Sequence, residues 1–158
     1  MNRVLERILV LDGSVPYEGQ IVGRNIVEGP VAKPDYASIP SAVYTVPALA
    51  SVGLTEAKAR EAGYKVKVGK VPFTAIAKAK IEDASDGFVK IVADETYGEI
   101  LGVHMIGNTV TEMIAEAVAA IALEGTVDDL VNTIHAHPTL SEATHEAMEN
   151  VFGAAIHL

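Results

Sequence analysis

Apolar and polar residues alternate through the middle of the chain in the manner of β-strands. Residues 65–71 read Lys-Val-Lys-Val-Gly-Lys-Val, and a period of two is typical of a strand with one buried face. Other stretches rich in β-forming side chains end at turn residues such as Pro47, or at the hairpin-length loop Glu95-Thr-Tyr-Gly. Five strands are therefore predicted, over residues 42–46, 50–54, 65–73, 87–94 and 99–106.

From Thr109 onward the apolar residues follow the period of a helix. One stripe of side chains is expected to face the core, and it consists of Val110, Met113, Ile114, Ala117, Val118, Ile121 and Ala122. Gly125 ends this helix, and Thr126 can cap a second helix over residues 127–133. A last helix is predicted from about residue 140 to residue 151.

Shorter helical patterns lie at residues 18–28 and, after the potential cap Thr55, at residues 56–62. Residues 3–11 could form a short strand or helix, and residues 30–40 form a connector. Strands in the middle and helices at the end predict an α+β fold, in which helices cover an antiparallel β-sheet.

Composition narrows the classes of protein that the chain can belong to. Its 158 residues suit one domain, and a net charge of −9 without a basic patch argues against nucleic-acid binding. No apolar run is long enough to cross a membrane, and the N-terminus does not have the pattern of a signal peptide, so a cytoplasmic location is expected. The chain contains no cysteine, which excludes a thiol nucleophile or a redox disulfide of its own.

The densest group of chemically capable residues is His135-Ala-His-Pro-Thr-Leu-Ser-Glu142. Pro138 disfavours a helical conformation at His137, and the stretch from Thr139 to Glu142 fits a capping box. That box would aim the Glu142 carboxylate at His137, which would fix the imidazole tautomer and stabilise its protonated form, as a general acid–base requires. The same residues could also form only a surface loop before a well-capped helix.

This stretch resembles the C-terminal signature of the pyridine-nucleotide disulfide oxidoreductases, and its His-Ala-His beginning is similar to dihydrolipoamide dehydrogenase in particular. Further resemblances occur in the order and spacing of the family, at residues 39–45, 50–56, 87–91 and 99–107. The similarity spans residues 17–158, which are expected to be an interface (dimerisation) domain, whereas residues 1–16 do not match the family.

The resemblance implies a role for each residue of the motif. His137 would be the catalytic base that takes a proton from a dithiol, Glu142 would orient it, and the backbone near His135 would approach the flavin of the other subunit of a homodimer. The complete enzyme would use FAD and NAD, and its dimer could bind the basic subunit-binding domain of a 2-oxo acid dehydrogenase complex acyltransferase.

The chain lacks the other parts of such an enzyme. It contains no glycine-rich dinucleotide fingerprint and no cysteine pair, so the chain alone is expected to be inactive and to bind neither cofactor. The alternative is a free-standing dimerisation or protein-interaction module without redox activity. No metal site is expected, because no cysteine or carboxylate cluster completes a ligand set around His135, His137 and His145.

Overall fold

The computed structural model describes residues 14–158, and the short element expected over residues 3–11 lies outside them. The strands are β1 (Ser41–Val43), β2 (Ala48–Gly53), β3 (Val66–Pro72), β4 (Phe88–Asp94) and β5 (Ile100–Gly107). The α-helices are α2 (Ser14–Glu28), α3 (Glu56–Glu61), α4 (Ala77–Ile81), α5 (Val110–Ala122), α6 (Val127–Val131) and α7 (Glu142–Val151). Two single-turn 3-10 helices are η1 (Tyr36–Ser38) and η2 (Phe73–Ala75). No helix within residues 14–158 is long and apolar enough to cross a membrane.

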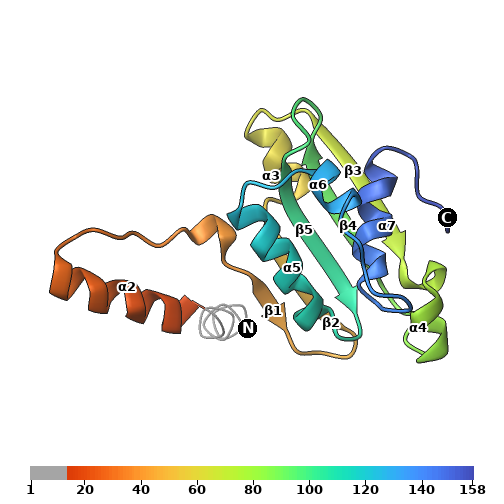
Figure 1. The fold of residues 1–158 in the computed structure, drawn as a ribbon, viewed down its shortest axis with the longest axis horizontal. Coiled ribbons are helices and arrows are strands. Elements are labelled where there is room, and N and C mark those ends of the chain that lie inside the picture. Colours follow the sequence, from red (N-terminus) through yellow and green to blue (C-terminus); the bar gives the residue numbers. More distant parts are fainter. Residues whose placement is uncertain (1–13) are drawn as a thin grey trace.

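The strands form one antiparallel sheet in the order β1-β2-β5-β4-β3 (Figure 1). The predicted hairpin of β4 and β5 pairs Val89 with Met105 and Ile91 with Val103, and it forms the centre of the sheet. At its turn the Asp94 carboxylate accepts hydrogen bonds from the backbone N–H groups of Thr96 and Tyr97, at 3.0 and 2.8 Å. The predicted α+β fold with an antiparallel sheet covered by helices is confirmed.

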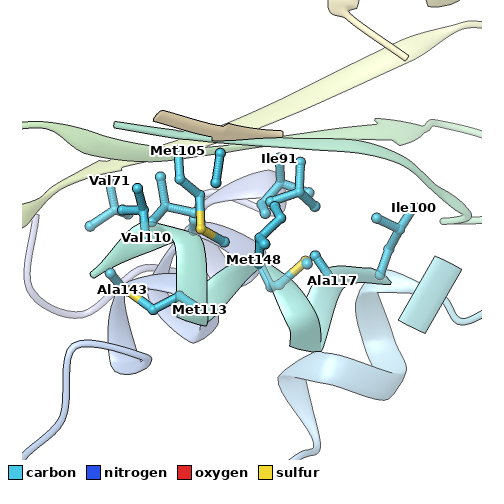
Figure 2. Close-up of a cluster of buried hydrophobic side chains, with 14 of the residues drawn as sticks. Val71, Ile91, Ile100, Met105, Val110, Met113, Ala117, Ala143 and Met148 are labelled. Carbon is cyan, nitrogen blue, oxygen red and sulfur yellow. The ribbon is translucent and has the colours of Figure 1, made fainter. Parts of the chain in front are cut away.

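Two of the C-terminal helices cover one face of the sheet. Helix α5 packs on β2 and β5, and α7 packs on β3 and β4. Figure 2 shows the core between these layers, where Met105 and Ile91 of the sheet face Met113 and Met148 of the helices. Burying such apolar side chains contributes about 1.5–3 kcal/mol each, so this layer provides much of the stability.

The stripe predicted on α5 is correct except at its end. Val110, Met113, Ile114 and Ala117 are buried, and Val118 and Ile121 pack against the core, but Ala122 is exposed. At 3.6 residues per turn, Ala122 lies about 120° around the helix from Val110, at the margin of the stripe. The helix therefore contacts the sheet along a narrower line than predicted.

Strand β3 buries apolar residues on both faces of the sheet. Val71 is fully buried toward α7, whereas Val66, five positions earlier and therefore on the opposite face, packs with a second small cluster around Ala59 of α3. The alternation in β3 was predicted as the sign of a single buried face. The difference arises because α7 packs against one face of β3 and α3 packs against the other.

Helix α4 was not predicted, and α3, α6 and α7 are shorter than expected. A five-residue helix such as α4 offers too few positions to show a period, although it buries Ala79 completely. Helix α6 has the predicted Thr126 cap, as a full capping box with Asp129, but it ends at Val131 rather than Thr133. Helix α2 begins at Ser14 and extends away from the sheet (Figure 1).

Helix α7 contains one buried polar group whose removal should stabilise the fold. Thr144 is completely buried, and its hydroxyl oxygen has no hydrogen-bond partner among the described residues. Because an unpaired buried hydroxyl is unfavourable, Thr144→Val should raise the free energy of unfolding by about 1 kcal/mol, measured by urea denaturation. Thr144→Ser keeps the hydroxyl and loses a methyl group, so it should lower stability instead. A loss of stability in Thr144→Val would show that the hydroxyl is paired.

Candidate acid–base site

The predicted base lies in the loop between α6 and α7. His137 is outside both helices, as the following proline predicts, and the His137–Pro138 peptide bond is cis. The loop brings the two predicted catalytic residues together, because His137 Nδ1 lies 2.7 Å from Glu142 Oε1. The other oxygen of that carboxylate, Oε2, accepts a hydrogen bond from the Thr139 backbone N–H at 2.8 Å.

Only half of the predicted capping box forms. The Glu142 carboxylate reaches back to the backbone of Thr139 as expected, but the Thr139 hydroxyl does not cap the helix. It donates instead to the Ala136 carbonyl at 2.8 Å, which closes the turn that contains His137. Helix α7 consequently begins at Glu142, two residues later than predicted.

The electrostatic environment keeps Glu142 ionised. Its partial burial raises the pKa of the carboxyl, but the hydrogen bonds from His137 and from the Thr139 N–H outweigh this and hold the pKa below its ordinary value. An ionised Glu142 fixes His137 with Nδ1 toward the carboxylate. The His137 side chain is 74% exposed, so Nε2 is the ring nitrogen that can exchange a proton with a group outside this chain.

His135 contacts a different carboxylate from His137. Its side chain is only 10% exposed, and Nε2 lies 2.6 Å from Oε1 of Glu116 on α5. The His135 ring also lies 5.5 Å from that of His145. This contact joins Glu116 to a histidine 19 residues away in the sequence.

The three histidines near this loop do not converge on one point. His145 Nε2 lies 3.1 Å from the Val131 carbonyl oxygen, while His135 and His137 face separate carboxylates. Within the described residues 14–158, no group of three or more histidine, cysteine, aspartate or glutamate side chains is arranged to hold a metal ion.

A third histidine–glutamate pair, formed by His157 and Glu146, was missed from the sequence. The His157 side chain is 62% exposed, but its Nδ1 lies 2.7 Å from Oε1 of Glu146, a residue that is only 4% exposed. The backbone N–H groups of Ile156 and His157 donate to Oε2 of the same carboxylate at 3.0 and 3.2 Å. A groove lies between this pair and the His137–Glu142 pair, and all four residues line it. Glu146 lies one helical turn after Glu142, and this spacing is the signal in the sequence that could have pointed to a second carboxylate beside His137.

The contact of Glu146 with the C-terminal segment should make stability depend on pH. Burial raises the pKa of Glu146, but hydrogen bonds from the His157 ring and from two backbone N–H groups outweigh it, so the pKa lies below its ordinary value. A carboxyl with a lowered folded-state pKa stabilises the fold above its unfolded pKa, about 4.3, and this stability is lost as pH falls through the folded value.

Glu146→Gln should therefore lower the free energy of unfolding by about 1 kcal/mol or more at pH 7, and should flatten its decline below about pH 5. Urea denaturation at a series of pH values measures both effects. His157→Ala removes the partner and should give a loss in the same direction. An acid decline as steep in Glu146→Gln as in the original chain would contradict the assignment.

Comparison with known proteins identifies the family to which this fold belongs. The sequence model of one protein family, the pyridine nucleotide-disulphide oxidoreductase dimerisation domain, matches residues 39–148. The chain belongs to this family. Among its relatives, a dihydrolipoyl dehydrogenase of Bacillus subtilis is 54% identical over 123 residues, which cover 78% of this chain and 26% of the relative. A dihydrolipoyl dehydrogenase of Haloferax volcanii is 45% identical over 140 residues, which cover 89% of this chain and 29% of the relative.

Solved structures show the same fold. LpdA from Mycobacterium tuberculosis superposes with a TM-score of 0.78 at 24% identity, over 84% of this chain and 29% of that chain. The flavoprotein disulfide reductase RclA from Escherichia coli, solved as a Cu(II) complex, superposes with a TM-score of 0.76 at 27% identity, over 82% of this chain and 30% of that chain. The chain thus spans less than a third of the length of these proteins.

Proposed function

We propose that residues 17–158 are the interface domain of a dihydrolipoamide dehydrogenase that uses FAD and NAD, and that this domain supplies His137 as the acid–base residue. Residues 1–16 are left outside the domain. The observation that carries the proposal is the His137–Glu142 pair, with its 2.7 Å contact and a histidine side chain that is 74% exposed. A base oriented by a carboxylate and facing outward is suited to a reacting group that another part of the protein, or another subunit, provides.

The family resemblance, together with this geometry, supports a role for each side chain. His137 Nε2 would accept the proton of a substrate thiol, which leaves a thiolate as the nucleophile. Glu142 would stabilise the resulting imidazolium and keep Nδ1 directed toward its carboxylate. Thr139 would hold Glu142 in place through its backbone N–H.

The geometry of Gly102 and Gly107 supports the expectation that a dinucleotide cofactor would not be bound by this chain. Gly102 and Gly107 lie in a packed strand rather than a loop, and a Cβ at Gly102 would overlap the Leu54 carbonyl oxygen. The flavin, whose function would be to accept the electron pair of the dithiol, and the nicotinamide nucleotide would therefore be bound outside residues 14–158. The backbone near His135 remains a proposed neighbour of the partner subunit's flavin.

Dimerisation should be measurable on the chain itself. Leu123 and Ile134, beside the last helices, are 82% and 97% exposed, and a two-fold interface would remove such side chains from water. Sedimentation velocity at tens of micromolar should therefore show a dimer. A clean monomer at that concentration would contradict the dimer interface proposed for this chain.

A chimera tests the proposed activity directly. Residues 39–158 would replace the corresponding part of the Bacillus subtilis relative, which is 54% identical over 123 residues. We expect the chimera to reduce NAD⁺ with dihydrolipoamide, while the 158-residue chain alone does not. A well-folded chimera that binds flavin but lacks turnover would favour the alternative, an interaction module without redox function.

The net charge of −9 supports a further partner, the basic subunit-binding domain of a 2-oxo acid dehydrogenase complex acyltransferase. Such binding should weaken as salt is raised through about 0.1 M and above, because exposed charges are then screened. A pull-down of the chain by that domain at increasing salt measures this. Absent or salt-independent binding would contradict the proposed partner.

A further inference from the structure

Glu116 connects the histidine loop to a different element from the one that carries Glu142. It lies on α5, which packs on β2 and β5, whereas Glu142 begins α7 on the other half of the sheet. The Glu116 side chain is partly buried, and its Oε1 lies 2.6 Å from His135 Nε2. Through this contact, the segment just before His137 is attached to α5.

Hydrogen-bond geometry shows how firmly His135 is held. Its Nε2 faces the Glu116 carboxylate, and its Nδ1 lies 3.1 Å from the Thr133 carbonyl oxygen, which can only accept. The contact to Thr133 is therefore a hydrogen bond donated by Nδ1, while Nε2 makes the second contact with the Glu116 carboxylate. Two directed bonds at opposite corners of a nearly buried ring leave it a single orientation.

His137 depends on such anchors because little else holds it. Its side chain is 74% exposed, so packing does not determine its position. On the C-terminal side the loop is held by the Thr139 N–H and hydroxyl, and on the N-terminal side only Ala136 separates His137 from the anchored His135. Glu142 orients the His137 ring, but the position of the His137 Cα is determined by the backbone on both sides of it.

We propose that Glu116 is a positioning residue for the acid–base histidine, acting through His135 to hold the loop against α5. The inference deepens the proposed function and rests on it for its catalytic meaning. The positioning itself can be measured without any activity. Glu116 would act together with Glu142, each carboxylate holding one of the two histidines of the motif.

The experiment is ¹⁵N relaxation and histidine-ring NMR on the 158-residue chain and on Glu116→Gln. In the original chain the backbone amides of Ala136 and His137 should have order parameters of about 0.85. In Glu116→Gln these order parameters should fall toward about 0.6, and the His137 ring signals should change. Glu112→Gln is the matched control, since Glu112 is exposed one turn earlier on the same helix. It should leave both readouts unchanged.

A second pair of variants separates positioning from general destabilisation. His135→Ala should reproduce the loss of order at His137, and His135→Gln, which keeps a donor toward Glu116, should restore part of it. Unchanged order at His137 in both Glu116→Gln and His135→Ala would overturn the proposal, and so would an equal loss of order throughout α5 and α7. Failure of the proposed function would appear elsewhere, as full turnover in a chimera that carries His137→Gln.

Discussion

Replacing His137 by glutamine should lower the turnover of dihydrolipoamide in the chimera by about 10²- to 10⁴-fold, the usual contribution of a positioned general base. Glutamine preserves much of the volume and can still bond to Glu142, but it cannot take a thiol proton near neutral pH. Because the side chain is 74% exposed, the substitution should not alter the fold. Steady-state rates across about pH 5–9 measure the effect, and the limb of the pH profile due to the histidine should disappear.

Two further variants show whether that loss is specific. His104→Gln is the matched control, since His104 lies in β5 with Nε2 3.0 Å from the Leu54 carbonyl oxygen, apart from the histidine loop. Its turnover should stay close to that of the original chimera. Glu142→Gln should give an intermediate loss, because it removes the charge that stabilises the imidazolium while His137 remains. A His137→Gln chimera with an unchanged rate would show that another group is the base.

Replacing Gly69 by valine should lower the free energy of unfolding by about 3 kcal/mol or more. Gly69 lies in β3 where the strand passes directly beneath α7, so that a Cβ there would overlap the Ala147 carbonyl oxygen and lie 2.7 Å from the Val151 nitrogen. These neighbours are backbone atoms, so the helix must move as a whole. The Lys70 N–H, which donates to the Asn150 side chain at 2.9 Å, would lose its partner as α7 shifts.

Urea denaturation of Gly69→Val measures the loss of stability, and the His137 ring signals should change as well, because α7 carries Glu142. Gly19→Ala is the control: Gly19 lies in α2, where a methyl group would have no neighbouring atom within 4 Å, so alanine there should be neutral or slightly stabilising. Stability within about 0.5 kcal/mol of the original chain in Gly69→Val would show that α7 does not approach β3 this closely.

Local chemistry in the sequence was enough to predict the hairpin and the first contact of the site. The β-forming residues of β4 and β5 and the short loop between them predict antiparallel pairing, because both signals depend on neighbouring residues. His137 and Glu142 are five residues apart, and the geometry of a helix start brings a carboxylate at Glu142 back to the entering chain. The contact between these two residues could therefore be expected before any packing was known.

Contacts between distant segments could be decided only by the tertiary structure. His135 reaches Glu116 because α5 and the loop before α7 pack side by side, and His157 reaches Glu146 because an irregular C-terminal segment folds back along α7. Position 69 has no room for a side chain because α7, which begins about 70 residues later in the chain, packs against the strand there. Periodicity describes which face of an element is apolar, but the partner of that face depends on how the whole chain packs. The sequence alone thus predicted the contact between His137 and Glu142, whereas the contacts of His135 with Glu116 and of His157 with Glu146 depend on the fold.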